Sequence, residues 1–173
     1  YAIGDTLSML DDRLLLTLGL RHQSMVYEGY LYGGGAQNSR YDQSRNSPLI
    51  GAIYKFSPAW SVYANSVQGL AQGETAPNAA VNRGQQMAPY VAKQQEVGLK
   101  FDGGRVGGAV ALFQTTKPRG YMGADEVFST AGKDRHRGVE LTAFGEPMKG
   151  LRGPGGLTSL DGVQQWTGDA STA

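Results

Sequence analysis

Turn signals divide the chain at regular intervals, and the breaks alternate between short and long. The short breaks, which carry turn-forming residues, lie at 11–13, 57–59, 102–105 and 146–150. The long polar stretches between them lie at 27–48, 69–93 and 117–135. If neighbouring strands are joined in this order, all tight turns fall at one edge of a sheet and all long loops at the other. This alternation constrains the fold more than any single motif does.

The segments between the breaks alternate apolar and polar residues with the period of two that is typical of β-strands. The pattern is clearest where Val97 and Leu99 alternate with Glu96 and Lys100. The segment 105–117 is too irregular for its faces to be assigned. The sequence therefore predicts an all-β fold of eight antiparallel strands, at 2–10, 14–26, 49–56, 60–67, 94–101, 105–117, 138–144 and 151–160.

Composition excludes several classes of protein. The chain has no cysteine, which excludes a disulfide scaffold and any cysteine-based metal site or nucleophile. Its 16 basic and 15 acidic residues lack the excess of positive charge that nucleic-acid binding requires. Its longest apolar stretches are too short for a membrane-spanning helix, and residues 1–5 lack the pattern of a signal peptide. Glycine, at 26 of 173 residues, is about twice as frequent as usual, and small residues allow tilted strands to bend.

A soluble β-sandwich and an antiparallel transmembrane β-barrel both fit eight alternating strands. The barrel is favoured because short periplasmic turns and long extracellular loops alternate in membrane barrels. Phe56, Trp60 and Phe101 flank the short turns, where an aromatic girdle at the membrane interface belongs. In a sandwich the same rings would cover one end of the core.

Several short motifs resemble, in order and spacing, the C-terminal half of the barrel of TonB-dependent outer-membrane receptors, specifically the ferric-siderophore branch. Each motif lies at the same position relative to a turn as in that family. The motifs are DTLS at 5–8, DDRL at 11–14, IYKFSPAWSVYAN at 53–65 with Gly69 and Leu70, KQQEVGLK at 93–100, ALFQTTK at 111–117 and RGVEL at 137–141.

The resemblance implies a barrel of about 22 strands around an N-terminal plug domain, in the outer membrane of a Gram-negative bacterium. Such a receptor binds a ferric siderophore and takes it up by active transport coupled to the TonB complex, which acts on the plug. Residues 1–173 would then be a partial barrel domain of about eight strands, without the plug or the remaining strands. No cofactor is implied, because ferric iron is carried only within the siderophore.

Two segments depart from the family pattern. Residues 151–156 hold Pro154 where the family begins an apolar strand, and residues 169–173 lack the terminal aromatic residue of such barrels. The alternative reading is a small closed outer-membrane barrel or an adhesin with a structural role and no transport.

The most basic stretch, KDRHR at 133–137, predicts a ligand-binding site at the barrel mouth. Together with Lys117 and Arg119, its cations would attract an anionic siderophore, and tyrosines would contact aromatic groups of the ligand. The candidate ligand-binding residues are Tyr90, Arg119, Tyr121, Arg135, His136 and Arg137, with Tyr27, Tyr30, Tyr32 and Tyr41 as weaker candidates. In the alternative interpretation the arginines at the strand ends contact lipopolysaccharide phosphates or water.

Catalysis is not expected. His22 and His136 are the two histidines, and no serine motif accompanies His22, whose expected role is that of a polar wall residue. The paired acids at 11–12 and 125–126 lie in a turn and a loop. The polar positions of the strands, including Glu96, Lys100 and Glu140, are expected to contact the plug rather than the ligand.

Overall fold

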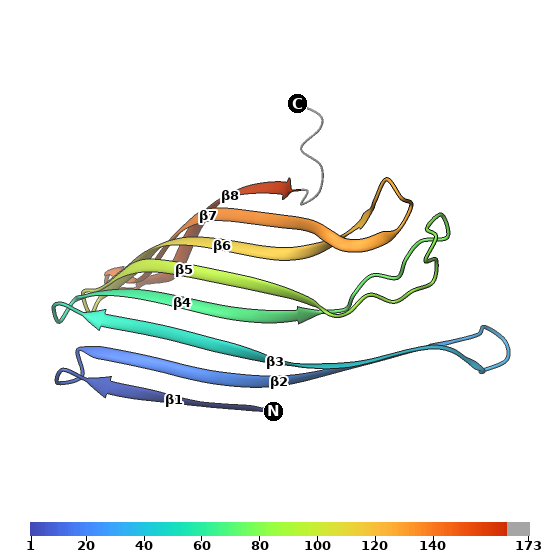
Figure 1. The fold of residues 1–173 in the computed structure, drawn as a ribbon. Helices are drawn as coiled ribbons and strands as arrows, with labels where there is room; N and C mark the ends of the chain where they lie inside the picture. Colours follow the sequence, from blue (N-terminus) through green and yellow to red (C-terminus); the bar gives the residue numbers. More distant parts are fainter. Residues whose placement is uncertain (166–173) are drawn as a thin grey trace.

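The structure is a computed structural model that describes residues 1–165, and these residues form one antiparallel sheet (Figure 1). Its strands are β1 (Ala2–Met9), β2 (Leu14–Tyr30), β3 (Gln37–Lys55), β4 (Trp60–Ala71), β5 (Tyr90–Asp102), β6 (Val106–Met122), β7 (Phe128–Met148) and β8 (Leu151–Gln165). They lie side by side in chain order, so the predicted all-β fold is confirmed. Within residues 1–165 no helix is long and apolar enough to cross a membrane. The segment 169–173 lies outside the described residues.

The connections alternate between the two edges of the sheet as predicted. The tight turns that join β1 to β2, β3 to β4, β5 to β6 and β7 to β8 lie together at one edge, and the other connections lie at the opposite edge (Figure 1). These two edges are the two ends of the strands, not the outermost strands β1 and β8. We call them the short-turn edge and the long-loop edge. Gly104 and Gly150 have φ angles of 78° and 84°, which glycine adopts without a steric cost, and this favours tight turns at these positions.

Two of the predicted long loops are wrong in extent. Only residues 31–36 and 123–127 lie outside strands there, because β2, β3, β6 and β7 continue far beyond their apolar segments. Strand pairing satisfies the backbone in these extensions, while polar side chains on both faces keep them compatible with water. Loss of the apolar pattern therefore marked the end of the apolar surface rather than the end of the strand. The connection between β4 and β5, at 72–89, is a true long loop.

The last predicted strand, 151–160, lies within β8, which runs through Pro154 and places it opposite Phe144. Among the described residues β8 pairs only with β7. A strand with one paired side tolerates a missing N–H better than a central strand does.

Register sorts the side chains onto two different faces. One cross-strand line, which we call the apolar line, joins residues from all eight strands: Leu7, Leu16, Ala52, Ala64, Val97, Leu112, Val139 and Ser159. The neighbouring lines place Tyr63, Glu96 and Glu140 on the opposite face, because successive residues of a strand point to opposite sides. We call these the apolar face and the polar face. In β6, Val110 and Leu112 belong to the apolar face, which assigns the segment that the sequence pattern left open.

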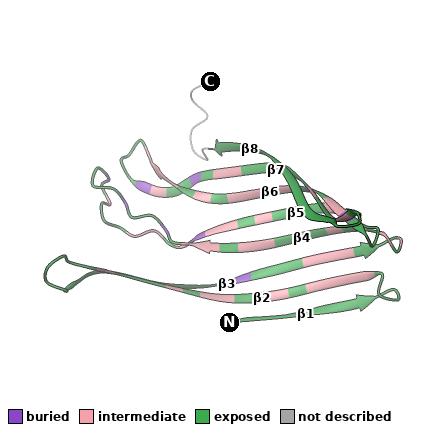
Figure 2. Cartoon of the chain, turned by 180° about the vertical axis from the view of Figure 1, so that it is seen from behind, coloured by how far each residue is buried: buried purple, intermediate pink, exposed green. Residues whose placement is uncertain are grey.

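No second layer covers the apolar face of residues 1–165. Val97, Leu112 and Leu157 are 51%, 54% and 68% exposed, while the few buried residues gather mainly toward the long-loop edge (Figure 2). A soluble sandwich would bury this face against a second sheet, so the sandwich is excluded for the described residues. Their pairing also ends at β1 and β8 without joining them, so these eight strands do not close into a small barrel.

Aromatic residues gather at the short-turn edge of the apolar face. The rings of Trp60 and Phe101 are cross-strand neighbours with centroids 4.8 Å apart. Tyr54 and Phe56 lie near the same edge and are 38% and 45% exposed. The predicted cluster is therefore present on the face that carries the aliphatic side chains.

Aromatic rings on the polar face lie over glycines of the neighbouring strand. A Cβ added to Gly98 would lie 2.5 Å from the Tyr63 ring, and one added to Gly138 would lie 2.5 Å from the Phe113 ring. Phe144 covers Gly107 in the same way. A ring that lies flat across a glycine shields backbone that no side chain covers. Part of the high glycine content therefore leaves space for aromatic rings of the neighbouring strand.

We predict that Gly98→Ala lowers the free energy of unfolding by about 1–3 kcal/mol, the usual cost of overpacking. The added methyl group displaces the Tyr63 ring, whose hydroxyl donates a hydrogen bond to Glu96 Oε1 at 2.5 Å and whose face lies 4.4 Å from Lys100 Nζ. Urea-induced unfolding measures the change.

The matched control is Gly51→Ala on the same face, where the added Cβ would lie 3.9 Å from its nearest neighbour. In a Tyr63→Ala background the cost of Gly98→Ala should largely disappear, because the clash is removed. An equal cost of Gly98→Ala in both backgrounds would contradict the close contact between the Tyr63 ring and Gly98.

Candidate ligand-binding site at the long-loop edge

The alternation of side chains along the strands places the six predicted ligand-binding residues on different faces of the sheet. Arg119 and His136 lie on the polar face, where His136 is the cross-strand neighbour of Thr115. Arg135 and Arg137 lie on the apolar face, as neighbours of Thr116 and Gln114. The basic stretch 133–137 therefore does not converge on one site, because its consecutive residues point to opposite sides of β7.

Tyr90 begins β5 on the polar side and is 1% exposed. Its ring lies 5.9 Å from Lys117 Nζ. A buried ring is not available to a ligand in this conformation, so Tyr90 has a packing role at the long-loop edge. Tyr121 follows a register shift in β6, lies opposite Ser129 and is half-buried.

Charged groups on the polar face form a mixed cluster at this edge. Lys117 is the cross-strand neighbour of Asp134, and Arg119 Nη1 lies 3.9 Å from Asp134 Oδ1. Glu74 reaches the cluster from the β4–β5 loop, since its carboxylate occupies the space that a side chain at position 120 would need. The side chain of Arg119 is 45% exposed, so its guanidinium retains donors for a further anion.

The β4–β5 loop is fastened onto the tip of the β6–β7 hairpin. The Asn82 side chain donates a hydrogen bond to the Phe128 carbonyl at 2.8 Å and accepts one from the Phe128 N–H at 2.9 Å. Phe128 packs with Ala76 and Ala80 in the small apolar cluster of this edge. The loop thereby covers the outer end of the polar face. Sequence reasoning missed Asn82 and Glu74, because no local pattern marks a contact between segments so far apart in the chain.

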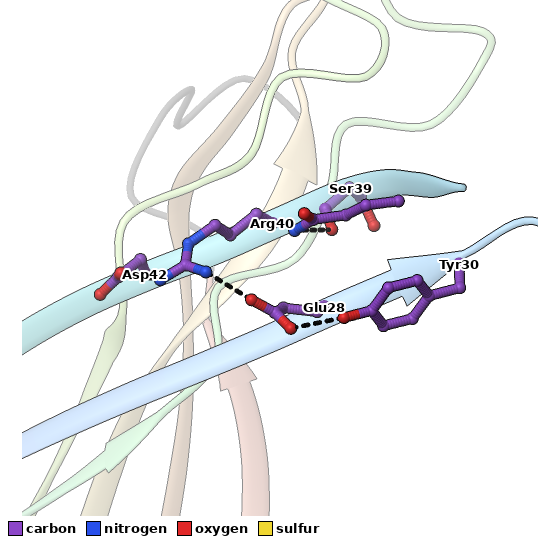
Figure 3. Close-up of polar contacts among 6 residues, drawn as sticks. Glu28, Tyr30, Ser39, Arg40 and Asp42 are labelled. Atoms are coloured by element: carbon purple, nitrogen blue, oxygen red, sulfur yellow. Dashed lines mark hydrogen bonds and ion pairs between the residues drawn. The ribbon is translucent and has the colours of Figure 1, made fainter. Parts of the chain in front are cut away.

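The hairpin formed by β2 and β3 extends beyond the rest of the sheet (Figure 1). Near its tip Glu28 accepts hydrogen bonds from both Arg40 and the Tyr30 hydroxyl, and Arg40 also pairs with Asp42 at 2.8 Å (Figure 3). The hydrogen bond to Glu28 raises the pKa of Tyr30, because the carboxylate stabilises the protonated phenol. These polar contacts join the two strands next to the cross-strand pair Tyr27 and Tyr41, whose ring centroids lie 6.3 Å apart.

The weaker tyrosine candidates of this hairpin differ in accessibility. Tyr27, Tyr30 and Tyr32 are 50%, 57% and 107% exposed, whereas Tyr41 is 4% exposed. The Tyr41 hydroxyl accepts a hydrogen bond from Gly73 N at 3.3 Å, which fastens the β4–β5 loop to β3. Tyr41 is therefore a structural residue, and the other three remain accessible.

A one-layer antiparallel sheet with an uncovered apolar face and a polar opposite face is the wall of a transmembrane β-barrel. The chain matches the family described as TonB dependent receptor-like, beta-barrel over residues 2–172, and it belongs to this family. It is 37% identical over 166 residues to the ferrichrome receptor FcuA of Yersinia enterocolitica, covering 92% of this chain and 22% of that protein.

Solved structures show the same relationship. BauA, the ferric preacinetobactin receptor from Acinetobacter baumannii, is 36% identical, with a TM-score of 0.76, and the match covers 93% of this chain and 24% of BauA. The ferric-catecholate import receptor Fiu of E. coli K12 shares the fold at 22% identity, with a TM-score of 0.75 over 97% of this chain and 28% of that one. The chain thus spans about a quarter of the length of the relatives it matches.

We predict that Asn82→Ala loosens the β4–β5 loop. The substitution leaves the Phe128 N–H and carbonyl without their side-chain partner, at a cost of about 1–3 kcal/mol in local stability. Amide hydrogen exchange of residues 81–85 should accelerate by about tenfold or more. Asn78→Ala, at an exposed position of the same loop, is the control and should leave exchange unchanged. Identical exchange in both variants would contradict the role of Asn82 in joining the β4–β5 loop to the β6–β7 hairpin.

Proposed function

We propose that the protein containing this chain is an outer-membrane receptor of a Gram-negative bacterium that binds ferric siderophores and imports them by TonB-coupled transport. The observation that carries the proposal is the identity of 36–37% with two receptors named for ferrichrome and for ferric preacinetobactin, over more than nine-tenths of this chain. The amphipathic sheet supports it, because the apolar face suits lipid and the polar face suits a hydrated lumen.

Within this proposal the polar face at the long-loop edge meets the ligand. Arg119 and His136 face the lumen with Lys117, and the exposed guanidinium of Arg119 offers hydrogen-bond donors to an anionic siderophore. Tyr121 lies beside this cluster, whereas Tyr90 is buried and has a packing role. Ferric iron arrives within the ligand, so the chain supplies no cofactor site, and the protein acts as a receptor without catalysis.

The remaining partners follow from the two faces. Glu96, Lys100 and Glu140 lie on the polar face, where they are placed to contact a plug domain. Coupling to the TonB complex passes through that plug. The apolar face contacts outer-membrane lipid, including lipopolysaccharide on the outer side.

The proposal predicts that Lys117→Gln/Arg119→Gln weakens binding of a ferric siderophore by about tenfold in the complete receptor, because partly exposed charges each contribute about 0.5–1 kcal/mol. The loss should shrink as salt rises, since added ions screen the charges. Binding is measured with labelled ferric siderophore at two ionic strengths, and uptake is measured with and without the proton gradient.

The matched control, Lys149→Gln/Arg152→Gln, removes two exposed cations at the short-turn edge and should leave ligand affinity unchanged. Equal affinity of both double variants would remove Lys117 and Arg119 from the site. Uptake that persists after the proton gradient is collapsed would refute TonB-coupled transport.

A further inference from the structure

The β2–β3 hairpin extends beyond the rest of the sheet, and in this extension β3 is paired on one side only (Figure 1). Pairing of β3 with β2 continues to Gln37, whereas pairing of β3 with β4 ends at Leu49, opposite Val67. Among the described residues, no backbone hydrogen bond outside these strand pairs involves residues 38–47. The side of β3 that faces away from β2 is therefore unpaired there.

The direction of the backbone groups identifies the residues that offer hydrogen bonds on this side. The Lys55 N–H donates to the Arg13 carbonyl at 2.8 Å, so Lys55 directs its backbone groups toward β2. This direction alternates along an antiparallel strand, and the register of β3 with β2 is unshifted from Tyr54 to Ser39. The even-numbered residues of β3 therefore face away from β2. We call the free N–H and C=O groups of four of them the open side of β3: Arg40, Asp42, Ser44 and Asn46.

Pro48 lies where the open side begins. Ile50 faces β4 and is paired with Ser66. The next residue of β3 that faces β4 is Pro48, which has no N–H to donate, and no pairing with β4 continues beyond Leu49. The two strands separate at this point, and β3 continues with β2 as its partner.

The β4–β5 loop does not supply the missing strand. Its backbone is bonded within the loop, where the Met87 N–H donates to the Glu74 carbonyl, and to the β6–β7 hairpin, where the Val81 N–H donates to the Glu126 carbonyl, both at 2.9 Å. The loop contacts β3 through the side chain of Tyr41, which points to the polar face. Pairing of the loop with β3 would break its own bonds, so the open side is left for a strand from outside the loop.

We propose that the open side of β3 binds an extended polypeptide segment of another protein, which adds to the hairpin as a third strand. Backbone donors and acceptors that repeat at the spacing of a strand are matched by another extended backbone. All four residues of the open side are exposed, so such a segment can reach them. In the orientation proposed above the hairpin lies outside the cell, so the partner is an extracellular protein. The inference does not depend on siderophore transport.

The side chains beside the open side favour a polar, basic segment. None of the four is apolar, so affinity depends on backbone hydrogen bonds and on charge. Glu28, Arg40 and Asp42 lie on one face of the hairpin, because Glu28 is the cross-strand neighbour of Arg40 and Asp42 is two residues from it. They carry two negative charges against one positive charge. A lysine or arginine opposite Asp42 is therefore favoured, and an acidic residue there is disfavoured.

The test uses the complete receptor in lipid nanodiscs and a labelled synthetic peptide that alternates threonine and lysine and has both ends blocked. Ser44→Pro removes an N–H of the open side and places a ring in the path of an added strand. Pro48 faces the same way, so β3 accommodates proline at such a position. The matched control is Ser44→Ala, which keeps the N–H. Heat-modifiable migration on gels verifies that both variants are folded barrels.

Ser44→Pro should weaken peptide binding by about fivefold or more, which corresponds to the loss of one hydrogen bond, whereas Ser44→Ala should bind as the wild type does. A peptide with glutamate in place of lysine should bind more weakly to all three proteins. Amide hydrogen exchange at single-residue resolution is the second readout. The peptide should slow exchange at Asp42, Ser44 and Asn46 and leave it unchanged at Gln43 and at 45, whose N–H groups already face β2.

Equal peptide binding by Ser44→Pro and Ser44→Ala would overturn the proposal, and so would unchanged exchange at 42, 44 and 46. A receptor dimer that forms without peptide and is lost in Ser44→Pro would also overturn it, because the open side would then pair with a second copy of this chain. Siderophore affinity, measured on the same samples, reports separately on the proposed transport function.

Discussion

The rest of the structure depends on the fact that a sheet one layer thick presents every second side chain to a different environment. One cross-strand line runs through all eight strands and holds mostly apolar residues, so that Leu16, Val97 and Val139 lie in one line across the molecule. Within the described residues nothing covers that line. The fold is therefore stable only where another apolar medium takes the place of a second layer, and a lipid bilayer is such a medium.

Stability of such a wall comes from contacts within the sheet rather than from a central core. The backbone ladder satisfies the polar groups of each strand, and rings seated on glycines fill the polar face between strands. Conventional apolar packing appears at the long-loop edge, where Phe128 contacts Ala76 and Ala80 and Asn82 locks the loop in place. The wall and its loops thus use different interactions, which allows the loops to change without disturbing the wall.

The sequence predicted the features that repeat along the chain. Period-two alternation and the order of short and long breaks were enough to find eight antiparallel strands, the two edges of the sheet and the position of Trp60 and Phe101 beside short turns. The extensions of β2, β3, β6 and β7 escaped prediction, because a strand with water on both faces has no apolar pattern. Glu28 and Arg40 hold such an extension together by charge instead.

The candidate site was less predictable than the fold, because it depends on side-chain direction and on contacts between distant segments. Reading 133–137 as one cluster overlooked the alternation that sends His136 and Arg137 to opposite faces. Tyr90 is 1% exposed, and Asn82, which bonds the nearby β4–β5 loop to Phe128, has no local signal of its role. The proposed transport function was suggested by motif order, and its support comes from the family and the named relatives rather than from any single residue of this chain.

The separation of the two faces is tested most directly by single cysteine substitutions along β5, since this chain contributes no native cysteine. Glu96→Cys, Val97→Cys, Leu99→Cys and Lys100→Cys are each introduced into the complete receptor in lipid, spin-labelled and measured by electron paramagnetic resonance. Accessibility to oxygen dissolved in the bilayer is compared with accessibility to a water-soluble nickel complex. We expect the labels at 97 and 99 to favour oxygen and those at 96 and 100 to favour the nickel complex or to be shielded from both. Equal accessibility at all four positions, or the reverse order, would contradict it.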